Sequence, residues 1–326
     1  MWYPLRFAPL YFEKVWGGRR LESLLGRALP AGEPIGESWE VSDHPHGRGV
    51  IANGALAGQS LHDVMTAHPE GLLGPHAQAA GNGQFPLLVK YIDAEEALSV
   101  QVHPNDAYGL AHEGEPGKTE MWYILHADPD TCLIAGLTPG TTREAFRDAL
   151  AHGDPGALLH RVPIRTGDSI YIPAGRIHAI MPGVLILEIQ QSSDTTYRLY
   201  DWGRVGLDGR PRALHVEQAL AVADWLDYAP GVTDNPAVPL GDNTVTRLAA
   251  CEYFVVEKYD LAAPQLLGTD TGSFRVLNIV AGGGTLTWSG GDEPLTRGDS
   301  LLLPAALSDV TLTPREAMSV VVSYVP

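Results

Sequence analysis

Lysine is scarce in this chain of 326 residues, although 22 of its side chains are basic. The only four lysines are Lys14, Lys90, Lys118 and Lys258, and the other basic residues are arginines. A lysine ammonium is a compact charge whose pKa shifts readily on burial, unlike a guanidinium. The first three lysines lie in the most motif-rich segments of the N-terminal half, so they are candidate functional groups, with chance placement as the alternative.

Positive charge is also scarce overall. The net charge of −17 argues against nucleic acids and anionic membranes as partners. An anionic substrate would need positive groups concentrated locally. No apolar run reaches about 18 residues, so no transmembrane helix is expected. The N-terminal segment lacks the basic start and apolar run of a signal peptide, and a cytoplasmic protein is predicted.

Cysteine is limited to Cys132 and Cys251, which are far apart and form no CxxC pair. A reducing compartment would leave them as free thiols, and both are expected to pack in the core.

Short β-rich segments recur between turns in a chain with 36 Gly and 25 Pro. The segments are 85–93, 121–127, 169–174, 184–190, 274–282, 284–290, 299–305 and 317–325. Many short strands between such turns indicate barrels or sandwiches. Helices are fewer: capping boxes predict one from Ser60 to about Ala67 and one after Thr141 that stops at Gly153, and a third is expected at 214–226.

One internal repeat links the two halves of the chain. Residues 167–178, GDSIYIPAGRIH, align without gaps to residues 298–309, GDSLLLPAALSD. Each copy has the pattern of a turn, a strand and a proline-marked bend, which indicates duplicated β-barrels. His178 of the first copy corresponds to Asp309, and residues 247–326 contain no histidine. A histidine-based metal site is therefore possible only in the first copy.

Three segments of the first half carry metal-ligand residue types. In LSVQVHPND, Gln101 and His103 are two apart and would share a strand face. In GKTEMWYI, Lys118 and Glu120 have the same spacing, and His178 ends the repeat. Two imidazoles, a carboxylate and an amide oxygen suit Zn²⁺ with an open position, although Fe, Mn, Co or Ni would also fit.

Several of these segments resemble a known family. GDSIYIPAGRIHAI is similar to the second cupin motif. FPLLVKYIDAEEALSVQVHPND, GKTEMWYIL and LEIQQSSDTTYRLYDWGR together resemble the short bacterial class of type I mannose-6-phosphate isomerases, as do YFEKVWGGRRL and GESWEVSDHPHG. The resemblance is close over residues 1–215 and looser beyond.

The resemblance implies a mostly β fold of two cupin-like, jelly-roll-type β-barrels with a few short helices. The expected organisation is a catalytic cupin domain with helical insertions at 1–226, a linker at 227–246 and a degenerate cupin barrel without a metal site at 247–326. It also implies one zinc ion per chain, bound by His103, Glu120 and His178, with Gln101 at the position of a fourth ligand in longer family members.

The implied reaction interconverts mannose 6-phosphate and fructose 6-phosphate by proton transfer through a cis-enediol. The family's active-site lysine corresponds to Lys118 and its arginine to Arg198, and Glu188 matches a position proposed as an acid/base. We rank Lys118 before Glu188 as the proton carrier. Arg198 would polarise the substrate or bind its phosphate, with charge added by Lys90, Arg204 or Arg19.

Each assignment has a structural alternative. Glu188 would be buried and could be an ion-pair partner of Arg198. Lys90 could be an edge-strand lysine that blocks aggregation. Asp201 and Arg204 could serve only to pair with each other. The ten remaining histidines, His215 among them, are not accompanied by other potential metal ligands and are interpreted as structural or solvated.

Two other functions stay open at this point. One is a different metal-dependent cupin enzyme, such as a dioxygenase or a sugar epimerase, although QxH replaces the HxH typical of dioxygenases. The other is a non-catalytic sugar-phosphate-binding bicupin. A small sugar phosphate is the expected partner, and a monomer is the expected state.

Overall fold

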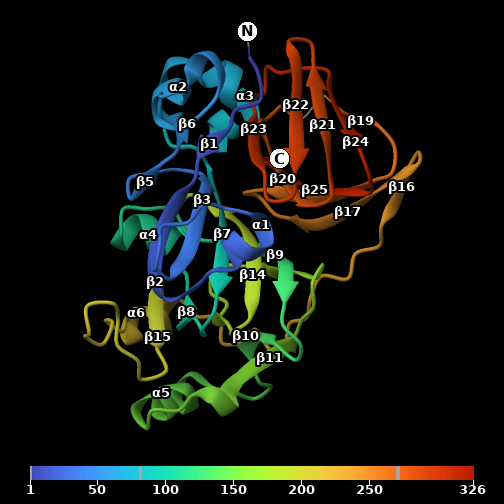
Figure 1. The fold of residues 1–326 in the computed structure, drawn as a ribbon. Coiled ribbons are helices and arrows are strands. Elements are labelled where there is room, and N and C mark those ends of the chain that lie inside the picture. Colours follow the sequence, from blue (N-terminus) through green and yellow to red (C-terminus); the bar gives the residue numbers. More distant parts are fainter. Residues whose placement is uncertain (1, 81–82, 269–271) are drawn as a thin grey trace. The chain divides into compact units, whose positions relative to one another are not determined.

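Strands make up most of the regular structure in the computed structural model, which describes residues 2–80, 83–268 and 272–326 (Figure 1). This confirms the predicted mostly β fold with a few short helices. The chain divides into two compact units. The first comprises Met1–Leu10, Trp39–Val89 and Asp234–Pro326, and the second comprises Tyr11–Ser38 and Lys90–Thr233. The domain boundaries predicted at 226 and 246 stay a prediction.

Two sheets build the second unit, with three strands, β2, β3 and β7, that also contribute residues to the first. The six-stranded sheet has the order β12 (Ser169–Ile172), β9 (Glu120–Ala127), β14 (Val184–Gln191), β7 (Leu87–Ala94), β2 (Leu10–Gly18) and β3 (Ile35–Val41). The five-stranded sheet has the order β11 (Leu159–Pro163), β10 (Cys132–Leu137), β13 (His178–Ile180), β8 (Val100–Val102) and β15 (Tyr197–Tyr200). The arrangement is of the cupin jelly-roll type, with two separate sheets in place of the expected closed barrel.

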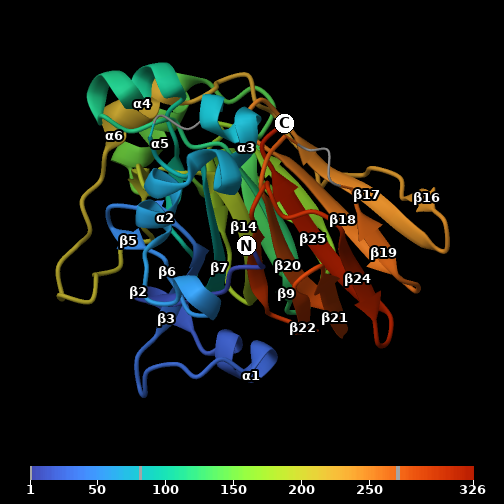
Figure 2. The ribbon, with the colours of Figure 1, turned by 90° about the horizontal axis from the view of Figure 1, so that it is seen from above.

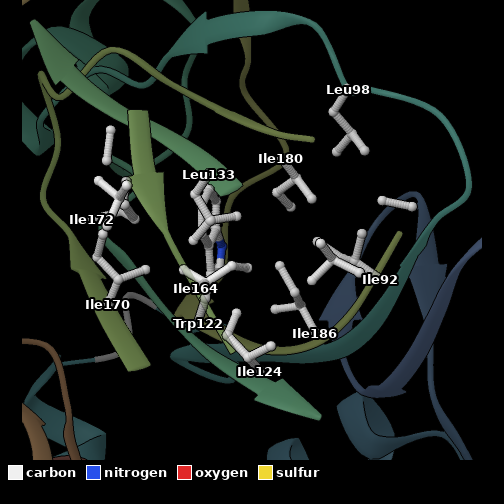
Figure 3. Close-up of a cluster of buried hydrophobic side chains, with 14 of the residues drawn as sticks. Ile92, Leu98, Trp122, Ile124, Leu133, Ile164, Ile170, Ile172, Ile180 and Ile186 are labelled. Atoms are coloured by element: carbon white, nitrogen blue, oxygen red, sulfur yellow. The ribbon is translucent and has the colours of Figure 1, made fainter. Parts of the chain in front are cut away.

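The core of the second unit lies between these two sheets (Figure 3). The six-stranded sheet contributes buried side chains such as Trp122, Ile124 and Ile186, and the five-stranded sheet contributes Leu133 and Ile180. Alternate residues of a strand point to one face, so each strand places a row of apolar side chains inward. This apolar core adjoins the polar residues that form the site described below.

Three helices of the second unit, α4 (Asp106–His112), α5 (Arg143–Ala151) and α6 (Val216–Val222), appear at the same edge of the view in Figure 2 and are separated along the vertical direction of Figure 1. A second apolar cluster joins Phe146 of α5 and Leu220 of α6 to Val100 of β8 and Leu199 of β15. The five-stranded sheet is therefore covered on both faces, and its strands β10 and β13 are almost continuously buried. No helix among the described residues has the length and apolarity needed to span a membrane.

The predicted helices are found with small differences. Ser60 caps α2 (Leu61–Ala67), as its capping box indicates. The cap of α5 is Thr142, whose Oγ1 accepts from the backbone N–H of Ala145, and the prediction of Thr141 was wrong by one residue. The expected helix at 214–226 is shorter, α6. The patterns did not reveal α1 (Arg20–Leu25), α3 (Pro69–Ala80) or α4; two 3-10 turns, η1 (Gly54–Leu56) and η2 (Gly156–Leu158), complete the set.

The C-terminal part of the first unit also has two sheets. Its six-stranded sheet has the order β16 (Val238–Leu240), β17 (Asn243–Ala250), β18 (Val255–Leu261), β25 (Met318–Tyr324), β20 (Arg275–Ala281) and β23 (Ser300–Leu303), and its four-stranded sheet has the order β19 (Gln265–Leu267), β24 (Val310–Pro314), β21 (Gly283–Trp288) and β22 (Gly291–Thr296). Two short pairs, β1 (Phe7–Ala8) with β6 (Val50–Ile51) and β4 (Asp43–His44) with β5 (Gly47–Arg48), complete the fold.

The sequence repeat is also a structural repeat. β12 pairs with β9 and β23 pairs with β20 after equivalent turns. Gly167 donates its backbone N–H to Ile124 at 2.9 Å, and Gly298 does the same to Ile279 at 2.8 Å. The φ angles of the two glycines are 96° and 92°, a region that side-chain-bearing residues avoid. The repeated Gly is therefore a requirement of the turn that opens each strand.

Candidate active site

The strand faces that point inward are apolar at one end, where they form the core, and carry polar side chains at the other end. In β9, Glu120 shares its face with Trp122 and Ile124 of the core. In β14 and β7, the residues on the same face as the core are Glu188 and Lys90. Alternate residues of the same strands therefore form both the apolar core and a buried polar cluster next to it. The whole cluster belongs to the second unit.

His103, Glu120 and His178 come together as the resemblance implied. One ligand atom from each lies within 4.8 Å of the others. Nε2 of His178 is 3.3 Å from Glu120 Oε1, and Nε2 of His103 is 3.5 Å from Glu120 Oε2. His103 follows β8, while Glu120 and His178 are the first residues of β9 and β13. All three side chains are buried.

Both imidazoles are oriented by backbone carbonyls. Nδ1 of His103 donates to the carbonyl oxygen of Thr195 at 2.9 Å, and Nδ1 of His178 donates to that of Arg176 at 2.9 Å. Such bonds fix the tautomer and leave the Nε2 lone pairs directed at the cluster. Burial lowers the pKa of His178 to about 3 and that of His103 well below its usual value. Both rings are therefore neutral, the form that binds metals.

The donor set fits a divalent metal ion. Both carboxylate oxygens of Glu120 and Nε2 of His103 are buried without a hydrogen-bond partner. Burial raises the pKa of Glu120 to about 8, with the nearby charge of Glu188 as the next cause. Leaving such groups unsatisfied is costly unless a cation completes the site. Two imidazole nitrogens and a carboxylate are ligands that metals such as zinc accept.

Gln101 lies at the edge of this cluster. Its register partners are His178 on β13 and Arg198 on β15. The amide nitrogen of Gln101 is 3.3 Å from Nε2 of His178. The oxygen and nitrogen of an amide are interchangeable by a flip of the group, and the flip places the oxygen at this position. Gln101 can therefore act as the fourth ligand.

Lys118 precedes β9 and is buried beside the metal ligands. Its Nζ is 3.5 Å from Oε2 of Glu120. Only 5% of its side chain is exposed, and it lines a cavity. The predicted proximity of Lys118 and Glu120 is therefore found, although Lys118 lies just before the strand and not in it.

Glu188 is held by two partners. Its Oε1 is 2.9 Å from Nζ of Lys90, and its Oε2 accepts a hydrogen bond of 2.7 Å from Nε1 of Trp122. The alternative of an ion pair with Arg198 was therefore wrong. Lys90 lies on β7, inside the six-stranded sheet, and is 4% exposed, so the alternative of an edge lysine was wrong too. Coulombic attraction by Glu188 and Glu37 outweighs burial and raises the pKa of Lys90.

Arg198 projects from β15 without a carboxylate partner among the described residues. Its Nε donates to Oγ of Ser99 at 3.2 Å, and its Nη1 donates to the carbonyl oxygen of Ala213 at 2.8 Å. Burial lowers the pKa of Arg198, and the charge of Arg212 adds to this effect. A guanidinium whose charge is not neutralised, beside a second one, is a natural anion site.

Arg204 and Arg212 share the carboxylate of Asp201. Arg204 binds Asp201 Oδ1 through Nε at 3.1 Å and Nη2 at 2.9 Å. Arg212 binds both oxygens of the same carboxylate. The predicted pairing of Asp201 with Arg204 is thus present, and a second arginine joins it. Together with Arg198, the cluster carries more positive than negative charge.

A cavity of about 290 Å³ collects most of these groups. Its lining consists of Lys14, Trp16, Glu37, Lys90, Ile92, Leu98, Ser99, Gln101, Lys118, Ile180, Glu188, Asp194, Thr196, Arg198 and Arg212. The structure therefore brings together every predicted substrate or catalytic residue except Arg204, which does not line the cavity. The suggested Arg19 instead binds Glu22 and the carbonyl oxygen of Pro30.

Sequence reasoning missed part of this lining, most notably Glu37, Asp194 and Arg212. The scarcity of lysine was the available signal for Lys14, because three of the four lysines line one cavity. In a chain of net charge −17, this is the local concentration of positive charge that an anionic substrate requires.

Comparison with known proteins decides the family. Residues 5–136 match a model described as the catalytic domain of type I phosphomannose isomerase, and residues 244–325 match the cupin domain of mannose-6-phosphate isomerase. The mannose-6-phosphate isomerase of Streptococcus mutans is 39% identical over 302 residues, which is 92% of each chain. The chain belongs to the type I phosphomannose isomerase family. The resemblance seen in the sequence is thereby confirmed.

Further relatives of this family agree. A probable mannose-6-phosphate isomerase of Bacillus subtilis is 37% identical over 96% of each chain. The crystal structure of a Bacillus subtilis mannose 6-phosphate isomerase superposes with a TM-score of 0.89 at 34% identity, covering 98% of this chain and 99% of the other. The two-part cupin fold is therefore common to these phosphomannose isomerases along their length.

Proposed function

We propose that the protein interconverts D-mannose 6-phosphate and D-fructose 6-phosphate, with one zinc ion held by His103, Glu120 and His178, and Gln101 as a fourth ligand. The observation that carries the proposal is the buried cluster of neutral imidazoles and unsatisfied carboxylate oxygens, in contact with two residues, Gln101 and Lys118, that line a cationic cavity. Family membership supplies the reaction. Among the metals that fit these donors, zinc best matches two imidazoles and a carboxylate with an open position.

The reaction moves a proton from C2 to C1 of the open-chain sugar. A bound zinc ion supplies a Lewis acid that stabilises the negative charge developing on the substrate oxygens. The chain must supply a group that takes the proton from one carbon and returns it to the other through a cis-enediol. Such a group must reach into the cavity and change its protonation state during turnover.

Lys118 fits this role best among the cavity residues. It is buried, it lines the cavity, and its Nζ lies 3.5 Å from a metal ligand. An amine in this position can take a proton from the substrate and return it. We infer that Lys118 would lie beside the carbon atoms whose oxygens the metal would stabilise.

Glu188 is the second candidate for the same role. Its two oxygens are already engaged by Lys90 and Trp122, which leaves neither oxygen free to take a proton from the substrate. In this arrangement Glu188 fixes Lys90 at the cavity wall, and Lys90 can contact the sugar hydroxyls. The geometry therefore supports the order of the two candidates that was chosen from the sequence.

The phosphate group of the substrate would bind at Arg198. Its Nη2 is left for a ligand after Ser99 and Ala213 have taken Nε and Nη1. Arg204 would contribute through the charge it shares with Asp201, without lining the cavity. Phosphate at one end and the metal at the other would orient the sugar carbons between them.

A coupled assay tests the proposal. Fructose 6-phosphate formed from mannose 6-phosphate is measured before chelation, after chelation, and after zinc is added back. Activity lost to the chelator and restored by zinc supports both the reaction and the metal. Folded, zinc-loaded protein that never converts mannose 6-phosphate would overturn the substrate assignment.

Two further parts of the proposal concern the setting of the enzyme. Both cysteines are free thiols, which agrees with a cytoplasmic location. We also propose, as expected from the sequence, that the protein acts as a monomer. Size-exclusion chromatography with light scattering at assay concentration measures this directly, and a stable dimer would contradict it.

A further inference from the structure

Arg198 is held in place by the segment that precedes α6. Its Nη1 donates to the carbonyl oxygen of Ala213. Its backbone N–H donates to Nδ1 of His215 at 3.2 Å, and its backbone carbonyl accepts from the N–H of His215 at 2.8 Å. The ring and the backbone of His215 therefore bind both backbone groups of Arg198, as a neighbouring strand would.

This pairing matters because β15 is the last strand of its sheet. On one side β15 pairs with β8, where Arg198 lies opposite Gln101. The backbone groups of an edge strand on its other side need partners from outside the sheet. For Arg198 both partners come from His215, one of the histidines interpreted as structural from the sequence.

The ring of His215 must be neutral to accept this hydrogen bond. Burial lowers the pKa of His215, and the charge of Arg198 lowers it further, while Glu113 opposes both. The other titratable group facing the ring from β15 is Tyr197, whose hydroxyl donates to Glu113 at 2.8 Å. On the helix that His215 precedes, the acidic residue of the first turn is Glu217. His215 also occupies the N-cap position of α6, where a positive charge is unfavourable.

We propose that His215 is a positioning residue, which holds Arg198 at the cavity through its unprotonated Nδ1 so that the guanidinium can bind the phosphate of the substrate. This rests on the role of Arg198 in the proposed function. Protonation of His215 replaces the acceptor by a donor that faces the N–H of Arg198. Substrate binding therefore weakens as the pH falls through the pKa of His215.

The test uses two substitutions with opposite expectations. His215→Ala removes the acceptor, and its KM for mannose 6-phosphate should rise about fivefold, the worth of one ordinary hydrogen bond, with kcat changed less. His215→Asn keeps an oxygen near the position of Nδ1 and does not titrate. It should keep the wild-type KM at neutral pH and show a smaller rise in KM at acid pH than the wild type, because protonation of the substrate phosphate, with a second pKa of about 6, raises KM in both. His160→Ala, in β11 and outside the cavity lining, is the control.

Titration calorimetry with inorganic phosphate separates this inference from the proposed function. Phosphate should bind the wild type and His215→Asn alike, His215→Ala about fivefold more weakly, and Arg198→Lys weakest of all. If Arg198→Lys is impaired while His215→Ala binds phosphate as the wild type does, the positioning role is refuted and the reaction stands. A rise in KM at acid pH that is as large in His215→Asn as in the wild type would also refute it.

Discussion

The indole Nε1 of Trp122 donates a hydrogen bond of 2.7 Å to Oε2 of Glu188, inside the six-stranded sheet of the second unit. The two residues are register partners on β9 and β14. Trp122 is completely buried and Glu188 is 2% exposed. Trp122 of the apolar core therefore also donates a hydrogen bond to a carboxylate of the cavity. The same side chain contributes to the stability of the fold and to the geometry of the site.

Replacing Trp122 by Phe should destabilise the protein by about 1–3 kcal/mol, because it leaves a buried carboxylate oxygen without its donor. The free energy of unfolding from denaturant titration measures this. Trp288→Phe in the other unit is the control, since the indole of Trp288 donates no hydrogen bond to any of the described residues. Equal losses for the two variants would show that the hydrogen bond contributes nothing.

Chelation should lower the melting temperature as well as the activity. Without a cation, the oxygens of Glu120 and Nε2 of His103 are buried and unsatisfied, so a bound metal stabilises the folded state alone. Differential scanning calorimetry with and without chelator measures the shift. His103→Ala should show no further shift on chelation. A wild type whose melting temperature ignores both chelator and zinc would contradict the metal assignment.

Lys118→Met should lower kcat about 10²- to 10⁴-fold, the usual contribution of a positioned acid/base group, with KM changed less. Zinc content should stay that of the wild type. Exchange of the C2 hydrogen of the substrate with deuterated solvent, followed by NMR, reports proton abstraction itself. If exchange persists in Lys118→Met and disappears in Glu188→Gln, the order of the two candidates is reversed.

Arg212→Lys should raise the KM for mannose 6-phosphate about tenfold, as expected for a charge-assisted contact. Arg204→Lys is its matched partner, because both arginines bind Asp201 and only Arg212 lines the cavity. Arg204→Lys should therefore change KM less. Steady-state kinetics of the two variants compares them, and a larger effect for Arg204 would mean that the loop rearranges when substrate binds.

Asp201 should stabilise the protein in a pH-dependent way. Burial alone would raise the pKa of Asp201, but its bonds to Arg212 and Arg204 outweigh this and lower it below the ordinary 3.8. A lowered folded-state pKa gives stability that is present above the unfolded pKa and lost as the pH falls through the folded value. Compared with Asp201→Asn, the wild type should be more stable at neutral pH, and the difference should shrink below about pH 4. A constant difference would contradict this.

Some of these features could be predicted from the sequence because they depend on local geometry. Ser60 caps α2 because a serine three residues before an acidic residue can bond to the first free N–H groups. Gly167 and Gly298 indicate equivalent turns, since residues with a side chain avoid the positive φ angles found there. The spacing of two residues between Lys118 and Glu120 indicates their proximity for the same reason. Where adjacent residues have equal chemistry, as Thr141 and Thr142 do, local rules cannot choose between them.

Other features depend on partners that are distant in sequence. The partners of Glu188 are Trp122 and Lys90, and only the strand order β9–β14–β7 shows this. The choice between Arg204 and Arg212 depends on the path of the loop after β15, which carries no periodic pattern. The role of His215 depends on which strand forms the sheet edge. The ligand set came from family resemblance, whereas its unsatisfied atoms are visible only in three dimensions.

The distribution of lysine also has a practical consequence for amine chemistry. Lys90 and Lys118 are 5% exposed, whereas the side chains of Lys14 and Lys258 are 33% and 21% exposed. Acylating dyes and aldehyde-activated resins react with accessible amines, so among the lysines they should select Lys14 and Lys258. Lys14 lies in the wall of the cavity. Immobilisation through Lys14 would thus obstruct the cavity. A saturating concentration of sugar phosphate during coupling should protect Lys14 and redirect attachment to Lys258.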